Sequence, residues 1–581
     1  MLSPITLITI FYTRFKVFFA LLLIFGLNHS LYSQGSNAPL DPTYYHLLDR
    51  LEITQGNFTT DFYTSYKPYR RYSIGRYVDT LYNQVSQYGS RQDQYNIQFL
   101  ANDNQEWSRY EKVDRKPILG VFYRTTPDLY AVNTRNFDLH VKPVIGLNLG
   151  YENGEAPKPY QNTRGAEIRA TIDNKVSFYT FLSENQVRYP GYIRSRITEY
   201  GTVEGGTAYN NVVPGQAFWK DFKEDGVDFF TARAHVSVNP TESINVQIGH
   251  ENFFIGNGIR SMVLSDYGPA YPYIKLQTKV WRFQYTNLFA QMRGRVPASA
   301  GGSQGSVSIP KKFFALHHLS LNITKNLNIG VFEAIVSGDS VSNGIEVDYF
   351  NPVIFYRAIE QYGGSQDNAM VGLDAKWNAW NKFQFYGQFV LDEFLLSAYQ
   401  EGNGWWANKW ALQLGGKYIN MFGINNLDGQ LEWNRVRPFM YTHQDQYTSY
   451  TNYAQPLAHP LGANFNEYIG NIRWQATPRL WVEGNLLYAT YGRSPEGKNF
   501  GDNVIESYNT RTLDNGNQIG QGIGNTLTSV QGGVSYMLAH RLWLEVTGTA
   551  RQQKIESSDD KNSLIIQGGV RYNLGANRFL W

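Results

Sequence analysis

The 581-residue sequence contains no cysteine. This absence excludes disulfide bonds, metal sites built on thiolates and a lipid-modified N-terminal cysteine. Charge of one sign is also scarce, because 52 lysine and arginine residues nearly balance 49 aspartate and glutamate residues. The formal net charge is therefore only +3, which gives no reason to expect a nucleic-acid partner.

Long hydrophobic runs are absent beyond the N-terminus, so no later segment predicts a transmembrane helix. At the N-terminus, Arg14 and Lys16 precede an eleven-residue apolar run, "VFFALLLIFGL" (17–27), which is followed by "NHSLYSQ". A basic start and a short apolar core are typical of a cleaved export signal, and the run is too short to span a hydrocarbon core of about 30 Å. We predict a signal peptide over residues 1–33 that directs the chain out of the cytoplasm.

Aromatic residues and glycine are abundant, with 42 Tyr, 34 Phe, 13 Trp and 53 Gly, yet the mean hydropathy is a polar −0.41. This combination indicates apolar residues spaced singly along many strands. From about residue 117 apolar and polar residues alternate with a period of two, most clearly in 381–394, 479–492 and 566–574. Such alternation is typical of half-buried strands, and a membrane barrel needs it to place apolar side chains toward lipid and polar ones toward the lumen.

Connection lengths alternate as well. Short turns are expected at 173–175, 239–243, 278–281, 324–326, 378–381, 421–425, 476–479 and 538–541. Long loops are expected at 187–225, 252–271, 296–310, 338–367, 438–463 and 492–523. Short turns on one side and long loops on the other predict an outer-membrane barrel with periplasmic turns, and eight turns imply about 18 strands, or about 20 if 117–126 is also a strand. The terminal "NRFLW" resembles the signal that the barrel-assembly machinery reads.

Residues 34–115 differ from the rest, because three stretches have helical character: 41–56, 67–85 and 90–110. The first opens with an Asp-Pro pair and closes at Gly56, as a helix with defined ends should. The sequence therefore predicts a small periplasmic α-helical domain at 34–115 and an all-β transmembrane antiparallel barrel at 116–581. The helices would also offer a docking site for an envelope protein.

The loops show no arrangement typical of an enzyme, a metal site or a cofactor site. His443 and His459 share a loop with Asp445 and Ser449, but none of them has the sequence context of a catalytic nucleophile. The neighbouring His317 and His318 lie on a predicted strand, where successive side chains point to opposite faces and cannot hold one ion. We predict no catalytic residue, no metal ion and no cofactor.

Loop side chains instead suggest binding or packing. One set is predicted to tie the loops together as a plug or to contact glycan: Arg260, Asp266, Arg357, Asp367, Asn368, His443, Gln455 and His459. A second, aromatic set is predicted to form a sugar-binding platform or a membrane belt: Trp405, Trp406, Tyr441 and Tyr450. A glycan surface, a structural plug and a protein contact all fit these residues, and the prolines of 351–357 and 455–462 would stiffen the loops.

Several of these stretches resemble a known family. They are "GNGIRSMVLSDYGPAYPYIKL", "NPVIFYRAIEQYGGSQDNAMVGLD", "GWWANKWALQLGGKYIN", "RPFMYTH" with "YAQPLAHPLGANF", and the N-terminal "YYHLLDRLEITQG" with "YKPYRRYSIG". They resemble the capsule-assembly Wzi-like outer-membrane family of Bacteroidota, and most of all its gliding-motility-associated RemB-like members.

The resemblance implies an 18-stranded barrel in outer-membrane lipid, with short helices on the periplasmic side. It implies a role in the assembly or attachment of surface polysaccharide, or in gliding-type motility, and in enterobacterial relatives the loops plug the lumen. Two alternatives from the residues stay open: a diffusion channel, and a structural partner of an envelope motility or secretion complex that docks through residues 40–115.

Overall fold

The computed structural model describes residues 35–60, 62, 65–109, 127–154, 158–199, 213–294, 310–338, 347–352, 356, 367–445 and 447–576. The predicted signal peptide, the strand considered at 117–126, Arg357 and the terminal "NRFLW" lie outside these residues.

Eighteen long antiparallel strands form a closed barrel, as predicted. They are β3 (Phe137–Glu152), β4 (Tyr160–Ile172), β5 (Val176–Arg188), β7 (Gly226–Thr241), β8 (Ile244–Glu251), β10 (Tyr271–Val280), β11 (Phe283–Arg293), β12 (Lys311–Asn322), β13 (Leu327–Ser337), β14 (Asn368–Ala379), β15 (Phe383–Leu391), β16 (Trp410–Tyr418), β17 (Leu427–Val436), β20 (Phe465–Thr477), β21 (Leu480–Arg493), β22 (Ile523–Ala539), β23 (Leu542–Ile555) and β24 (Lys561–Tyr572). The barrel closes where β24 pairs with β3. The short strands β2 (Tyr130–Asn133) and β6 (Lys220–Phe222) add to β3 and β7.

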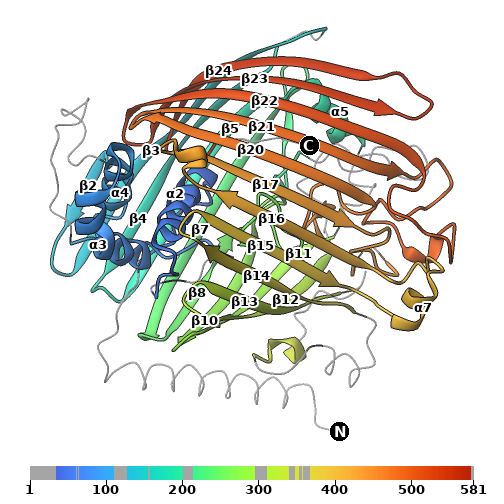
Figure 1. The fold of residues 1–581 in the computed structure, drawn as a ribbon, viewed down its shortest axis with the longest axis horizontal. Coiled ribbons are helices and arrows are strands. Elements are labelled where there is room, and N and C mark those ends of the chain that lie inside the picture. Colours follow the sequence, from blue (N-terminus) through green and yellow to red (C-terminus); the bar gives the residue numbers. More distant parts are fainter. Residues whose placement is uncertain are drawn as a thin grey trace, which may run out of the picture.

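The two ends of the barrel differ in their connections. Each predicted short turn lies between two neighbouring strands at one end, which we call the short-turn end. The opposite, long-loop end carries the connections 252–270, 437–464 and 494–522, among others. Figure 1 shows the strands running between these two ends, with α7 (Leu396–Glu401) at the long-loop end.

The strand sequences explain the two faces of the wall. On β20, Tyr468 and Ile472 are 50% and 53% exposed on the outer face, whereas Glu467 and Asn471 on alternate positions are buried in the lumen. The outer face is thus apolar and the inner face polar, which is the arrangement of a membrane barrel. Large exposed aromatic side chains gather at the short-turn end, including Trp281, Trp380 and Phe422. Such residues mark a membrane–water interface.

Three helices precede the wall, close to where they were predicted: α2 (Pro42–Gln55), α3 (Arg71–Tyr88) and α4 (Arg91–Asp103). In α2 the Asp41 side chain accepts a hydrogen bond from the Thr43 amide, and the helix ends at Gly56 with φ +69°. The third helix ends at Asp103, seven residues before its predicted end at 110. None of the helices in the described segments is long and apolar enough to cross a membrane.

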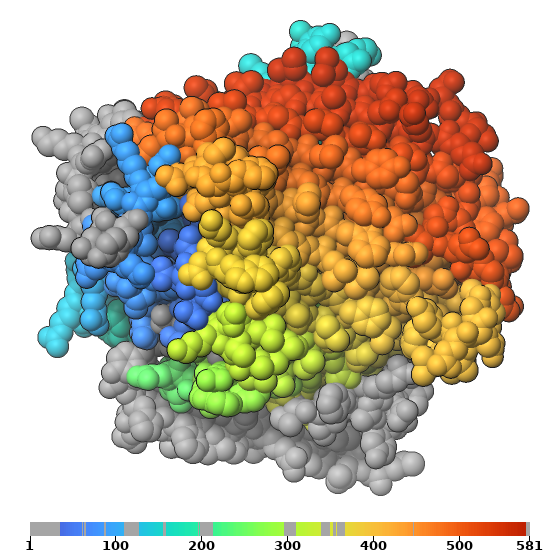
Figure 2. All heavy atoms as spheres, viewed as in Figure 1, coloured from blue at the N-terminus to red at the C-terminus, as the bar shows by residue number. Residues whose placement is uncertain are grey.

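These helices lie at the short-turn end of the barrel, with α2 inside its outline in Figure 1. We call residues 35–60 and 65–109 the helical unit. Its side chains contact the inner wall directly, and in Figure 2 part of it is visible behind the wall strands. The remaining short elements are β1 (Tyr66–Lys67), α5 (Gly191–Glu199), β9 (Phe254–Ile255), η3 (Val347–Phe350), η4 (Met421–Gly423), β18 (Thr451–Asn452), β19 (Gln455–Pro456) and η5 (Tyr508–Thr510).

Candidate functional site

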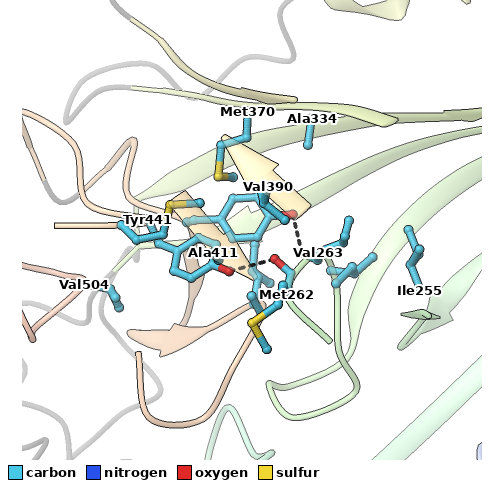
Figure 3. Packing of buried hydrophobic residues seen from close by; sticks show 14 of the residues in the cluster. Ile255, Met262, Val263, Ala334, Met370, Val390, Ala411, Tyr441 and Val504 are labelled. Atoms are coloured by element: carbon cyan, nitrogen blue, oxygen red, sulfur yellow. Dashed lines mark hydrogen bonds between the residues drawn. The ribbon is translucent and has the colours of Figure 1, made fainter. Parts of the chain in front are cut away.

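Two connections from the long-loop end fold into the lumen. We call residues 252–270, between β8 and β10, the first inner loop, and residues 437–464, between β17 and β20, the second inner loop. Their apolar side chains form one buried cluster with inward-facing wall residues, and Figure 3 shows Met262 and Val263 of the first loop beside Tyr441 of the second. The centre of the barrel is therefore packed with protein at this level.

Hydrogen bonds join the two inner loops. The Tyr441 hydroxyl donates to the Met262 carbonyl at 2.7 Å, and the Tyr450 hydroxyl donates to the Val263 carbonyl at 2.8 Å. The two tyrosine rings stack with centroids 5.7 Å apart. Both residues are only 1% exposed, so neither ring offers an open face to sugar or lipid. The prediction that they form a platform or a membrane belt is corrected accordingly: long loops can fold inward, and periodicity does not reveal that.

The first inner loop is bound to the wall through its backbone. The amides of Ile259 and Arg260 donate to the Glu432 carboxylate of β17 at 2.6 and 3.0 Å, and the Met262 amide donates to Gln388 Oε1 of β15 at 2.7 Å. A loop has unpaired backbone donors that must find acceptors when buried. The inward-facing side chains of the wall supply these acceptors.

A buried triad of ionisable side chains ties both inner loops to β20. Arg260 Nη2 lies 3.2 Å from Glu467 Oε1, and His459 Nε2 lies 2.7 Å from Glu467 Oε2. Arg260 is 8% exposed, and His459 and Glu467 are fully buried. The sequence indicated Arg260 and His459 but not Glu467 or Glu432. The available signal was a carboxylate on the polar alternation of a strand, in the part of the wall that faces the lumen.

Further contacts hold the second inner loop. Asn368 Nδ2 donates to the Thr448 carbonyl at 2.9 Å, and Lys312 Nζ donates to the Ser449 carbonyl at 2.6 Å. Gln455 Nε2 donates to the Gln216 carbonyl at 2.9 Å. Asn368 and Gln455 were both predicted, whereas Lys312 was not.

His443 belongs to the same loop and is fixed within it. Its Nδ1 lies 2.6 Å from the Thr448 hydroxyl, and its carbonyl accepts from the Tyr508 amide. Burial lowers the pKa of His443 to about 4, and the nearby charge of Lys409 acts in the same direction. The imidazole is therefore neutral near pH 7.

Asp266 and Asp367 are the other predicted residues of this set that the structure describes. Asp266 belongs to the first inner loop and lines a cavity. Asp367 accepts a hydrogen bond from the Tyr349 hydroxyl at 2.5 Å, and Tyr349 packs in a separate cluster with Phe313 and Ile335. Asp367 thus sits apart from the Arg260–Glu467–His459 triad, whereas Asp266 lines the same cavity as Arg260.

Trp405 and Trp406 lie at the long-loop end and are half-buried. The Trp406 amide donates to the Asp514 carbonyl at 2.9 Å, its ring lies 4.8 Å from that of Tyr508, and the Arg511 guanidinium lies 4.4 Å from its centroid. These contacts connect residues 405–406 to the loop 494–522. They stand at the opposite end of the barrel from Trp281 and Trp380.

The helical unit closes the short-turn end through buried ion pairs with the wall. Lys376 Nζ lies 2.7 Å from Glu52 Oε2, and Lys417 Nζ lies 2.7 Å from Asp49 Oδ2. Burial by itself would raise the pKa of Asp49, but the nearby charges of Lys417, Lys67 and Lys376 together outweigh burial and lower the pKa. The helices are thus held by charge complementarity as well as by apolar contact.

A cavity of about 740 Å³ remains between the helical unit, the inner loops and the wall. Its lining includes Tyr179, Asn185, Asn252, Asp266, Asn471 and Arg473. Aromatic, amide and charged groups of both signs thus face one chamber of mixed polarity. Within the described ranges no three His, Asp or Glu side chains are placed to hold a metal ion together.

Comparison with solved structures identifies the fold. Wzi, an outer membrane protein involved in group 1 capsule assembly in Escherichia coli and a carbohydrate-binding β-barrel, matches with a TM-score of 0.55 and 15% identity. The match covers 94% of this chain and 100% of that chain.

Weaker matches are OccAB2 of Acinetobacter baumannii, with TM-score 0.40, 8% identity and coverage of 75% and 97%, and OprD of Pseudomonas aeruginosa, with TM-score 0.39, 10% identity and coverage of 75% and 96%. No protein-family model matches the chain, and a search of curated proteins finds no match. The chain therefore shares the barrel fold of Wzi.

Proposed function

We propose that this chain is a non-enzymatic outer-membrane barrel that acts in the assembly or attachment of surface polysaccharide. The observation that carries the proposal is a lumen filled from both ends, by the helical unit on one side and by the two inner loops on the other. A general diffusion channel needs a continuous aqueous path. A filled barrel instead offers a rigid wall that presents loops at one end.

The similarity to Wzi over nearly the whole chain supports the same reading, since Wzi is a carbohydrate-binding barrel involved in capsule assembly. The loop stretches that resemble RemB-like proteins of Bacteroidota extend the proposal to gliding-type surface motility. The proposal includes that residues 1–33 are an export signal and that barrel-assembly machinery inserts the chain into outer-membrane lipid.

Orientation follows from the connections. In outer-membrane barrels the short turns face the periplasm and the long loops face outward. The helical unit would then be periplasmic, where an envelope protein could reach it, and residues 392–409 and 494–522 would be at the cell surface. These surface segments carry Trp405, Trp406, Tyr508 and Arg511, whose flat rings and donors suit sugar C–H faces and hydroxyls.

The direct test measures cell-bound against shed surface polysaccharide in a strain that lacks the protein. We expect polysaccharide to shift into the medium and the wild-type gene to reverse the shift. A Trp405→Ala chain should restore attachment only in part, whereas the matched Trp380→Ala chain, altered at the other end of the barrel, should restore it fully. An unchanged distribution would overturn the polysaccharide role and leave the motility role to be tested by cell spreading.

A second candidate function is passage of small solutes, and the cavity of about 740 Å³, with polar and charged side chains in its lining, favours it. Planar-bilayer recording of the purified protein distinguishes an occluded barrel from a solute channel. A filled lumen predicts no steady current, whereas a steady current would favour the channel.

A further inference from the structure

Two segments that enter from opposite ends of the barrel meet inside it. Strand β1 of the helical unit pairs antiparallel with β9 of the first inner loop, with Tyr66 opposite Ile255 and Lys67 opposite Phe254. The Gly256 amide extends the pairing by donating to the Ser65 carbonyl at 2.6 Å. This small sheet lies away from the wall sheet, in the lumen.

Side chains fix the pair against the wall. The Tyr66 ring lies 5.5 Å from the Phe253 ring, and both residues are at most 2% exposed. Lys275 of β10 places its ammonium 5.7 Å from the centroid of the Tyr66 ring and 5.1 Å from that of Phe253. One cation thus contacts an aromatic ring from each of the two segments, an arrangement that stabilises both.

The contact continues toward the long-loop end. The Ile255 amide donates to the Leu264 carbonyl at 2.9 Å and folds the first inner loop back on itself. That fold places the Met262 and Val263 carbonyls under the hydroxyls of Tyr441 and Tyr450. A continuous set of hydrogen bonds therefore runs from residue 65 to the second inner loop.

We propose that residues 65–67 hold the first inner loop in its lumen-filling position, so that the helical unit regulates how firmly the lumen is closed from the other end. The inference rests on the occluded lumen of the proposed function. It implies that a protein that displaces the helical unit on one side of the membrane loosens the loops on the other side.

A competing arrangement is that Glu432 and Gln388 alone hold the first inner loop. Hydrogen–deuterium exchange on the purified full-length barrel distinguishes this arrangement from the proposed one, by comparing wild type with Tyr66→Ala. We expect amide exchange in residues 256–266 to accelerate about tenfold, with a smaller acceleration in residues 439–451.

The matched control is Tyr95→Ala, because Tyr95 also belongs to the helical unit but points its hydroxyl at Met537 Sδ on β22, 3.2 Å away. It should leave exchange in residues 256–266 unchanged. Equal exchange in that peptide for Tyr66→Ala and wild type, or equal acceleration by both variants, would overturn the proposal.

A second experiment guards against misfolding of the alanine variant. Because the chain has no cysteine, Tyr66→Cys combined with Ile255→Cys creates a single disulfide between facing positions, within the reach of such a bond. Reducing that bond should accelerate exchange in residues 256–266, and identical exchange in both redox states would contradict the inference. A steady bilayer current through the wild type would reject occlusion separately, without deciding the exchange result.

Discussion

Lys376 Nζ on β14 lies 2.7 Å from Glu52 Oε2 on α2, and each side chain is 1% exposed. The pair joins the helical unit to the wall inside the lumen, where water is excluded. Burial raises the pKa of Glu52, because it outweighs the charge of Lys376. A buried pair of this kind specifies position but stabilises little, since the loss of hydration offsets the attraction.

Removing one partner of this ion pair should therefore destabilise docking more than removing both partners. Glu52→Gln is expected to weaken docking of α2 by about 3–5 kcal/mol, because buried Lys376 loses the carboxylate that it contacts. Glu52→Met combined with Lys376→Met should recover most of that loss. The measurement is amide exchange in residues 42–55 as a function of urea.

The control for this cycle is Glu184→Gln, which breaks the exposed pair between Arg164 and Glu184 on the outer wall. It should leave exchange in α2 unchanged, since this pair lies on the outer face of the wall and α2 lies inside the barrel. If α2 docks as weakly in the Glu52→Met, Lys376→Met variant as in Glu52→Gln, the prediction is wrong. That result would mean that two methionines cannot replace the ion pair.

Glu467 should be the residue on which closure by both inner loops depends most. Glu467→Gln removes the carboxylate that both Arg260 and His459 contact, and because the Arg260 guanidinium is then left buried without this partner, we expect the inner loops to lose about 3–5 kcal/mol of local stability. Limited proteolysis and amide exchange in residues 256–266 and 456–464 measure this loss. Glu483→Gln is the matched control, because Glu483 pairs with Arg473 between two wall strands. Inner loops that stay protected in Glu467→Gln would contradict the prediction.

Much of the barrel follows from local sequence. Alternation over 479–492 and the turn at 476–479 depend on neighbours in the chain, so the strands and their connections could be placed in advance. The direction of a long loop does not depend on neighbours. Nothing local distinguishes a loop that projects into water from one that fills a lumen, which is why the sequence left a surface platform, a membrane belt and a lumen plug all open for Tyr441 and Tyr450.

The wall carboxylates show a second limit of prediction from sequence. Glu432 and Glu467 stand on the polar alternation of their strands, and that pattern predicts only that they face the lumen. Whether a lumen-facing carboxylate meets water or a loop amide depends on residues far away in the sequence. The pairing of Tyr66 with Ile255 is the extreme case, because no local pattern connects an N-terminal segment with a loop between β8 and β10.

The second inner loop should loosen in acid through His443. Its pKa is about 4 in the folded loop and about 6.5 in an unfolded chain. Above pH 6.5 both states are neutral and stability does not change. Between pH 6.5 and 4 the unfolded loop binds the proton first, so local stability falls, by about 3 kcal/mol at most. Below pH 4 both states are protonated and the loss stays constant.

Amide exchange in residues 439–445, corrected for its intrinsic pH dependence, tests this expectation. His443→Gln should remove the change between pH 6.5 and 4, whereas His250→Gln, a substitution of an exposed histidine on β8, should retain it. Wild-type exchange that is independent of pH in this window would show that His443 is not buried as a neutral group.

Gly256 should be intolerant of a side chain. Its φ of +133° is one that L-residues rarely adopt, and a Cβ there would lie 2.7 Å from Gln388 Nε2, which itself donates to the Ile255 carbonyl at 2.8 Å. Gly256→Ala must therefore displace either the wall contact or the β1–β9 pairing, at a cost of roughly 1–3 kcal/mol.

The control Gly497→Ala has a φ of +72° but nothing within 4 Å of the new Cβ, so it should cost only about 1 kcal/mol, confined to its own loop. Thermal unfolding together with amide exchange in residues 256–266 distinguishes the two, because only Gly256→Ala should accelerate exchange in that peptide. Equal effects of the two substitutions there would mean that the first inner loop accommodates a displaced Gln388, and that its position depends on the β1–β9 pairing more than on the wall.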